Sequence, residues 1–394
     1  MTLPEDVLIC APVRTPHGRY GGSLRDVPAV DLGVVAATGA LERAALPAEQ
    51  VDELVVSNCR QAGNGPNPGR QIGVRAGLPE PVPAQTINMA CASGLMSLEH
   101  ARRSLLLDAA QVALVVAVES MSTMPYLAPS GLRWDGVRRG DITLVDGWRD
   151  GGTDPVCGLN MGETAENVAA TYGIERRAQD DWAHRSHQRV AAAWADGRFG
   201  EEVVAVDHER GRLDRDETFR EDSQRDKLDG LRPAFVPDGS VTAGNASQMA
   251  DGAAAMVVAT RSAAASAGIA PVGRVHAFAS VGVDPAHMGI GPTVAIPAAL
   301  EQAGLTREDI ALFEINEAFG AQIVHNVRTL GLDPDRVNVN GGGIALGHPT
   351  GQSGARVVVT LLHELRRRGE RYGVASLCVG GGMGVAAVVE RVDA

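Results

Sequence analysis

The 394-residue chain is poor in aromatic residues, which make up only 4% of it, and it carries no excess of positive charge. Its 48 acidic residues outnumber 36 arginines and lysines, which gives a net charge of −12. Proteins that bind nucleic acid neutralise phosphates with a basic surface, so this balance argues against a nucleic-acid partner. A few local cations would still suffice to bind an anionic small molecule.

Cysteines are few and scattered. None of the five belongs to a C-x-x-C pair, which argues against a disulfide framework and against a structural zinc site. The N-terminus lacks the basic start and apolar stretch of a signal peptide, and no apolar run approaches the roughly 18 residues that span a bilayer. We therefore expect a reduced, cytoplasmic protein with no membrane segment.

Two segments of the chain repeat each other. Residues 40–58 (ALERAALPAEQVDELVVSN) align without a gap with residues 299–317 (ALEQAGLTREDIALFEINE), and the apolar pattern persists where identity fades. A second match follows at almost the same shift, because Ser93-Gly94 recurs as Ser353-Gly354. Repeats with one consistent shift indicate an internal duplication.

Each Ser-Gly pair opens a segment with apolar residues at helical spacing, and each segment leads to an apolar strand. The strands are VALVVAV (112–118) in one copy and ASLCV (375–379) in the other. Strands that alternate with helices are typical of layered α/β folds. The chain is therefore predicted to form two similar α/β halves.

The region between the two halves has a different texture. Residues 121–247 are richer in charge, glycine and proline, but they also contain a helical portion and tryptophans that need burial. We interpret this region as an inserted loop domain rather than a disordered linker. The first half then comprises residues 1–120 plus about 248–270, and the second half comprises residues 271–394.

Two residues suggest nucleophilic chemistry. Cys91 stands where an extended segment turns into a predicted helix, and the N–H groups and dipole of a helix start lower the pKa of a thiol. His348 lies between glycine-rich turns, also just before a predicted helix, where it can activate such a thiol as a base. The alternatives are a buried structural cysteine and a histidine bonded to a loop carbonyl.

Two more residues end predicted strands. Cys378 runs into a glycine-rich turn, where a thiol can serve as an acid or base and backbone amides can bind an oxyanion. Asn316 offers a neutral donor for a water or an oxyanion. Both signals are weak alone, because such sites also suit a core cysteine and asparagine is common in turns.

Other features are discounted. His184 and His187 have the spacing of metal ligands, but no carboxylate or cysteine cluster accompanies them, so we interpret them as a solvated helix face and predict no metal. The glycines of 341–347 follow a strand-like segment, residues 336–340. They lack the G-x-G-x-x-G spacing and the distant acidic residue of a dinucleotide site, which argues against a nicotinamide oxidoreductase.

Four motifs together resemble the catalytic motifs of the thiolase family, in that family's order. They are NMACASG (88–94), INEAF (315–319), GGGIALGHPTGQSGAR (341–356) and CVGGGMG (378–384). Similar segments cover nearly the whole chain. The resemblance implies a five-layer αβαβα fold of two duplicated halves with an inserted loop domain, assembled as a homodimer or homotetramer.

The resemblance also implies roles for single residues. Cys91 would be the nucleophile that accepts the acyl group, and His348 the base that takes its proton. Cys378 would move a proton at the α-carbon of acetyl-CoA. One oxyanion hole would combine His348 with a water held by Asn316, and the other would use the backbone N–H groups of Cys91 and Gly380.

Coenzyme A contacts follow by the same resemblance. Ser247 matches a position that contacts pantetheine, Met161 one that packs against the acyl end, and Arg220 one that stacks on adenine. Asn160 stands where short-chain biosynthetic members have histidine, which affects the acyl-chain preference. CoA and acyl-CoA are implied as substrates, with no permanently bound cofactor.

The implied function is reversible condensation of two acetyl-CoA molecules to acetoacetyl-CoA, or thiolytic cleavage of a short 3-ketoacyl-CoA. One alternative is a degradative 3-ketoacyl-CoA thiolase of broader chain length. Another is a non-catalytic protein that binds acyl-CoA, although the intact motif residues count against it.

Overall fold

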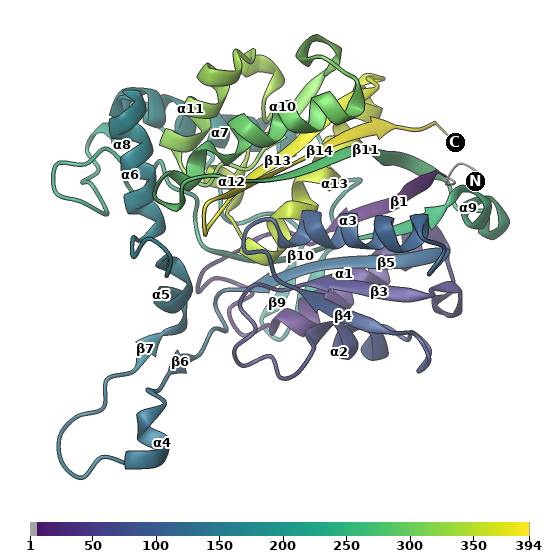
Figure 1. Cartoon of the computed structure of the whole chain (residues 1–394), viewed down its shortest axis with the longest axis horizontal. Helices are drawn as coiled ribbons and strands as arrows, with labels where there is room; N and C mark the ends of the chain where they lie inside the picture. Colours follow the sequence, from purple (N-terminus) through teal and green to yellow (C-terminus); the bar gives the residue numbers. More distant parts are fainter. Residues whose placement is uncertain (1–5, 394) are drawn as a thin grey trace.

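The computed structural model describes residues 6–393, except for the side chains of residues 150 and 151. Its core is a 10-stranded sheet in the order β12-β13-β14-β11-β1-β10-β5-β3-β4, with β2 paired to β10 (Figure 1). The strands are β1 (Val7–Arg14), β2 (Gly18–Arg19), β3 (Glu53–Ser57), β4 (Ala84–Ile87), β5 (Val112–Ser120), β10 (Ala250–Thr260), β11 (Pro271–Gly282), β12 (Leu312–Ile315), β13 (Tyr372–Val379) and β14 (Met383–Arg391).

Helices and sheet alternate in five layers, as predicted. Helices α3 (Ser93–Leu106) and α13 (Thr350–Arg368) lie between the two ends of the sheet and share one apolar cluster with both ends (Figure 1). The outer faces are covered by α1 (Ala29–Ala44) and α2 (Pro68–Arg75) on one side and by α10 (Gly291–Ala303) and α11 (Gly320–Leu330) on the other.

Strand β5 shows how the sequence produces these layers. Its side chains alternate between the two sheet faces, so Val115 and Ala117 join the central cluster while Leu114 and Val116 pack in the outer cluster with α1. A strand buried on both faces needs a continuous apolar run rather than an alternating one, and VALVVAV provides it.

The predicted duplication is confirmed in three dimensions. Helix α1 is capped by Ala45 and helix α10 by Gly304, and both residues adopt the left-handed conformation. Each is followed by one 3₁₀ turn, η1 (Ala48–Gln50) or η3 (Arg307–Asp309), and then by the corresponding strand, β3 or β12.

One element expected from sequence is missing in the second half. The strand predicted over residues 336–340 is reduced to a single bridge between Val337 and Phe313, where the first half has all of β4. The reason is local. Asn338 has a positive φ of 48°, and its side-chain amide bonds both the N–H and the carbonyl of Ile315, each at 2.8 Å, in place of a strand backbone.

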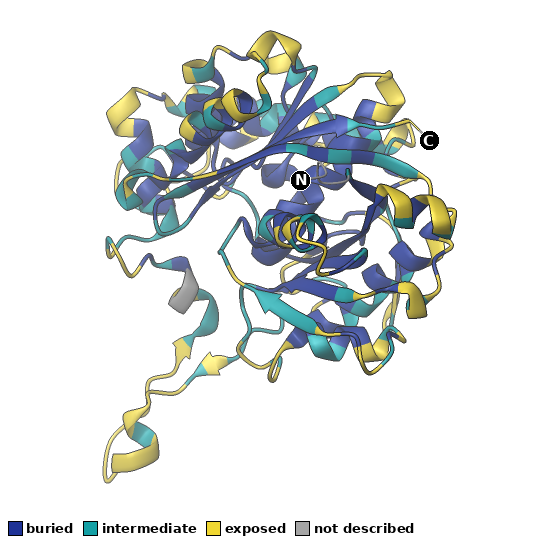
Figure 2. Cartoon of the chain, turned by 45° about the vertical axis from the view of Figure 1, so that its right-hand side comes forward, coloured by how far each residue is buried: buried dark blue, intermediate teal, exposed yellow. Residues whose placement is uncertain are grey.

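The region between residues 121 and 249 contributes no strand to the main sheet. Its helical portion is interrupted at Gly173, and an arm extends from the body with mostly exposed residues (Figures 1 and 2). The elements of the whole region are β6 (Tyr126–Leu127), α4 (Gly131–Asp135), β7 (Val145–Asp146), α5 (Gly147–Gly152), α6 (Met161–Tyr172), α7 (Arg176–Ala195), β8 (Val206–His208), β9 (Gly211–Leu213) and α8 (Arg225–Asp229).

The interpretation of His184 and His187 as a solvated face is wrong for His187. Its side chain is buried, and its Nδ1 accepts a hydrogen bond from the backbone N–H of Arg220 at 3.1 Å. Burial lowers the pKa of His187 to about 4, so the ring is neutral and able to accept that bond.

The remaining elements are short. They are α9 (Arg261–Ala267), η2 (Pro285–Ile290), η4 (Pro334–Arg336) and α12 (Gly343–Leu346). Within the described part of the chain, no helix combines the length and the apolar character needed to cross a bilayer.

Candidate active site

Cys91 lies on a tight turn between β4 and α3. The turn is strained, because Ala90 adopts a positive φ of 45°. The Ser93 hydroxyl holds it by accepting the N–H of Met89 at 2.8 Å and donating to the carbonyl of Ala90 at 2.6 Å. The strand-to-helix position expected for Cys91 is therefore confirmed.

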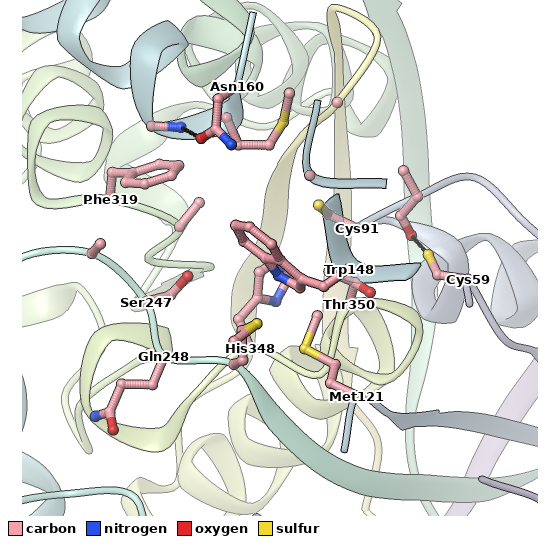
Figure 3. A pocket seen from close by; sticks show the side chains of 18 of the residues that line it. Cys59, Cys91, Met121, Trp148, Asn160, Ser247, Gln248, Phe319, His348 and Thr350 are labelled. Carbon is pink, nitrogen blue, oxygen red and sulfur yellow. Dashed lines mark hydrogen bonds between the residues drawn. The ribbon is translucent and has the colours of Figure 1, made fainter. Parts of the chain in front are cut away.

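A cavity of about 200 Å³ opens onto Cys91 (Figure 3). Its wall is largely apolar, with methionines, Trp148 and two phenylalanines. Both halves and the region between them contribute to it. Six residues singled out from sequence line this cavity: Cys91, Asn160, Met161, Ser247, His348 and Gly380.

His348 is held on the turn between α12 and α13. Its backbone N–H donates to the carbonyl of Gln248 at 2.8 Å, and its Nδ1 lies 2.6 Å from the hydroxyl of Ser353. That hydroxyl donates to the carbonyl of Pro349 at 2.9 Å, so we assign the imidazole proton to Nδ1. Nε2 is then the atom that can accept a proton.

The protonation state of His348 suits a base. Burial, together with the nearby charge of Arg356, lowers the pKa of His348 to about 3, so the ring is neutral at physiological pH. The amide nitrogen of Asn316 lies 3.5 Å from each ring nitrogen. Asn316 is buried behind His348 rather than in the cavity wall.

The pKa of Cys91 moves in the opposite direction from the one predicted for a helix start. Burial raises it and outweighs three effects that lower it: backbone hydrogen bonds from Gly380 and from Cys91 itself, and the positive charge of Arg60. Burial removes part of the hydration of the sulfur, and a thiolate there loses more hydration than one helix turn returns. Cys91 therefore needs a base to become a nucleophile.

Cys378 ends β13 as expected and is fully buried next to the site. Burial raises the pKa of Cys378, and the proximity of Cys91 raises it further, so Cys378 is a neutral thiol at rest. Gly380, two residues on, lies against Met161, whose sulfur would be 3.4 Å from a Cβ at that position.

Asn160 begins α6 and faces the cavity. Its side-chain oxygen Oδ1 accepts the N–H of Gly162 at 2.9 Å, which leaves the side-chain amide nitrogen on the cavity side (Figure 3). Arg220 is the one predicted contact that does not reach the cavity. It is exposed on the loop after β9 and does not line the wall.

A buried carboxylate that sequence reasoning missed connects the segments around the site. Glu119 accepts hydrogen bonds from the side chains of Asn58 and Thr350, both at 2.7 Å. It also accepts the backbone N–H groups of Arg60 at 3.0 Å and Gly351 at 2.9 Å. The sequence does contain a signal for it, a lone glutamate near the end of an otherwise apolar strand, because a buried carboxylate needs hydrogen-bond partners.

A cysteine and a neutral histidine in one cavity, between the halves of a duplicated fold, suit acyl transfer through a cysteine. The family model for the N-terminal domain of thiolase matches residues 7–262, and that for the C-terminal domain of thiolase matches residues 269–391. The chain belongs to the thiolase family.

Known relatives extend over the whole chain. It is 46% identical over 392 residues to the acetyl-CoA acetyltransferase of Cupriavidus necator, covering 98% of this chain and 99% of that one. It is 42% identical to the 3-ketoacyl-CoA thiolase of Bacillus subtilis, with 98% and 99% covered. The solved human mitochondrial 3-ketoacyl-CoA thiolase in complex with CoA superposes with a TM-score of 0.96 at 40% identity, covering 100% of this chain and 99% of that chain.

Proposed function

We propose that this thiolase condenses two acetyl-CoA molecules into acetoacetyl-CoA and free CoA, and that it also runs the reverse cleavage. One observation carries the proposal: a cysteine and a neutral histidine line the same cavity, with a second thiol buried beside them. The acetyl preference is supported by the name of the Cupriavidus necator relative, acetyl-CoA acetyltransferase.

In the first step, His348 Nε2 takes the proton of Cys91 as the sulfur attacks the thioester carbon of acetyl-CoA. CoA leaves with a proton, and the acetyl group remains on the sulfur. Negative charge develops on the thioester oxygen during this attack, so fixed N–H donors lower the barrier. We assign this role to the backbone N–H groups of Cys91 and Gly380.

In the second step, Cys378, which has given its proton to the departing CoA, removes a proton from the α-carbon of another acetyl-CoA, and the resulting carbanion attacks the acetyl-cysteine. The Cys91 sulfur that is released takes its proton back from His348. In the reverse direction, the thiol of CoA cleaves a 3-ketoacyl-CoA. We assign the second oxyanion site to His348 and a water held by Asn316. The Oδ1 atom of Asn316 is buried and finds no partner within the described chain, which suits it to bind a water.

For CoA itself, we assign binding mainly to the inserted region 121–247. Ser247, at the end of that region, and Met161 would contact the pantetheine, since both line the cavity. Arg220 would stack on the adenine from its exposed position outside. No metal is invoked, and CoA acts as a substrate rather than as a resident cofactor.

The test is CoA-dependent cleavage of acetoacetyl-CoA beside a longer 3-ketoacyl-CoA, with Cys91→Ala as the control. Strong preference for acetoacetyl-CoA supports the short-chain function. Equal or faster turnover of the longer substrate supports a degradative thiolase, a candidate favoured by the name of the Bacillus subtilis relative and by the amide of Asn160 in the cavity. CoA binding without any turnover would indicate a non-catalytic protein.

We further propose that the protein is a cytoplasmic homodimer or homotetramer that acts on short fatty acyl groups. Exposed aromatic residues on the arm support self-association, with Trp134 80% and Tyr126 67% exposed. Sedimentation of the purified protein tests the number of subunits, and cell fractionation tests the location.

A further inference from the structure

His17 is a fully buried histidine between β1 and β2. Its Nδ1 atom lies 2.8 Å from the carbonyl oxygen of Leu346, in the second half of the chain. A carbonyl oxygen can only accept a hydrogen bond, so we assign the ring proton to Nδ1, which donates to Leu346. The contact joins the start of the chain to the turn that carries His348.

The backbone of His17 is fixed as well. Its N–H donates to Oδ1 of Asp216 at 2.7 Å, and the same carboxylate binds the guanidinium of Arg14 through two nitrogens, at 2.7 and 2.9 Å. All three side chains are buried. Burial lowers the pKa of His17 to about 4 in spite of the charge of Asp216, so the ring is neutral at physiological pH. His17 is therefore an uncharged donor in a fixed place.

Leu346 is the last residue of α12 and stands two residues before His348. The last carbonyl groups of a helix have no partner within the helix. The Leu346 oxygen therefore takes partners from outside, and it accepts a second hydrogen bond from the hydroxyl of Thr218 at 2.9 Å. Gly347 follows with a φ of 85°, a conformation that glycine adopts and leaves easily. The path of the backbone into His348 thus depends on how firmly the Leu346 carbonyl is held.

The other ring nitrogen of His17 is an independent indication of a role. Nε2 is buried and finds no partner among the described residues of the chain. A buried polar atom without a partner costs stability, so an apolar ring of similar shape would suit this place at least as well. The hydrogen bond to Leu346 is the contribution that such an apolar ring could not make.

We propose that His17 is a positioning residue for the catalytic base. Its Nδ1–H holds the Leu346 carbonyl, and through it the backbone of His348, so that Nε2 of His348 faces the thiol of Cys91. This inference rests on the proposed thiolase function and adds to the site a residue that does not line the cavity. His17 acts on the transfer of the Cys91 proton and not on the binding of CoA.

The experiment separates the donor of His17 from its volume. His17→Asn keeps an N–H near the place of Nδ1 but is smaller than imidazole, whereas His17→Phe keeps a ring without a donor. Thr218→Val removes the other donor to Leu346 at almost the same shape. Acetylation of Cys91 by acetyl-CoA is measured by rapid quench from about pH 6 to about pH 9, and stability is measured by urea denaturation.

The matched control is His325→Phe. His325 is also buried, but its Nδ1 lies 3.4 Å from the hydroxyl of Thr329 on the next turn of the same helix, α11. It has no printed contact with the turn of His348, so this variant should be acetylated at the wild-type rate.

At neutral pH we expect His17→Phe and Thr218→Val to be acetylated about five- to tenfold more slowly, the effect of one lost hydrogen bond, with the KM for acetyl-CoA unchanged. His17→Asn should keep most of the rate but unfold at a lower urea concentration, because it leaves space in the core. His17→Phe should show the opposite combination, a slow reaction in a stable protein. The rate thus follows the donor, and stability follows the volume.

The pH dependence identifies the step. His348 stays neutral at every pH well above its pKa of about 3, so the wild-type rate should change little over this range. Without a well-placed base, the reaction depends on the fraction of Cys91 that is already thiolate. Burial raises the pKa of Cys91, so this fraction is small at neutral pH and grows with pH. The deficits of His17→Phe and Thr218→Val should therefore narrow as pH rises.

Three results would overturn the proposal. They are rates that follow stability across the His17 variants, a deficit that is the same at every pH, and wild-type rates in both His17→Phe and Thr218→Val. If His17→Phe does not fold, Thr218→Val decides by the same two criteria of rate and pH. A wild type that acetyl-CoA does not acetylate at all would instead refute the proposed thiolase function.

Discussion

Gly94 and Gly354 lie against each other where α3 and α13 meet at the centre of the molecule. A Cβ atom on Gly94 would lie 2.5 Å from the backbone nitrogen of Ala355, and one on Gly354 would lie 2.4 Å from that of Leu95. The two glycines occupy equivalent positions in the duplicated halves. The turns that hold Cys91 and His348 lead directly into these helices. The contact between the two glycines therefore sets the distance between Cys91 and His348.

Alanine at either glycine should therefore be costly. Each Cβ would collide with backbone atoms, which cannot rotate away, so we expect Gly94→Ala and Gly354→Ala each to lower the free energy of unfolding by about 1–3 kcal/mol. Urea denaturation measures this loss. Gly230→Ala is the control, because a Cβ there meets nothing nearer than 3.8 Å. Equal stability of all three variants would show that the helices can separate freely.

The two proposed catalytic cysteines should be separable by experiment. We expect Cys91→Ala to abolish synthesis and cleavage, because no acyl-enzyme can form. Cys378→Ala should still gain an acetyl group from acetyl-CoA, visible as a mass increase of the intact protein, but should not form a carbon–carbon bond. Loss of acetylation in Cys378→Ala would contradict this division of roles.

Ser353 should act through His348. Its hydroxyl accepts a hydrogen bond from the Nδ1–H of His348 and so keeps Nε2 available as the base. We therefore expect Ser353→Ala to slow acetylation of Cys91 at least about tenfold. Rapid-quench measurement of acetylation, repeated across pH, checks this. The control is Ser97→Ala, which removes a buried hydroxyl of α3 that bonds the carbonyl of Ser93 in the same helix. An equal effect of both changes would point to helix packing instead.

Arg220 should affect affinity and not chemistry. It lies outside the cavity, so Arg220→Ala should raise the KM for CoA about two- to fivefold, as expected for an exposed stacking cation, and leave kcat unchanged. Steady-state kinetics at varied CoA concentration measures both constants. A fall in kcat at saturating CoA would place Arg220 closer to the reaction than we propose.

Asp251 should make stability depend on pH. Burial raises the pKa of Asp251 from 3.8 to about 6, so the folded chain holds this proton more tightly than the unfolded chain does. The contribution to stability is complete below the unfolded value and is lost as pH rises through about 6. Relative to Asp251→Asn, the wild type should lose up to about 3 kcal/mol between pH 4 and pH 7. Urea titrations of both proteins at the two pH values test this, and a parallel response would contradict it.

Much of the fold could be predicted because it depends on local patterns. The apolar run of β5, the helical spacing after Ser93 and the matching segments at 40–58 and 299–317 each specify an element and its neighbour. The strand expected over 336–340 failed because one side chain, that of Asn338, replaces backbone pairing. No composition rule predicts that a side-chain amide will take the hydrogen bonds of a neighbouring strand.

The site was less predictable wherever it depends on surroundings. A helix start indicated a lowered pKa for Cys91, but desolvation in the folded chain reverses the direction of the shift, and a sequence does not show desolvation. Arg60 stands in an irregular loop without periodicity, so no sequence pattern predicted that it lines the cavity. Glu119 acts through a hydrogen bond to Gly351, more than two hundred residues away. Ser353 acts through a hydrogen bond to His348 on the neighbouring turn.

The strand pairing that connects the two halves is short for a sheet of this size. Strands β1 and β11 pair at only two positions, across a register shift, while the central helices provide most of the contact. The proposed nucleophile enters from one half, and its base and the second cysteine enter from the other. A chain cut between α9 and β11 would leave two fragments, each with an intact half-sheet and an inert set of side chains. Acyl transfer would return only when the fragments reassemble, which makes activity itself a reporter of docking.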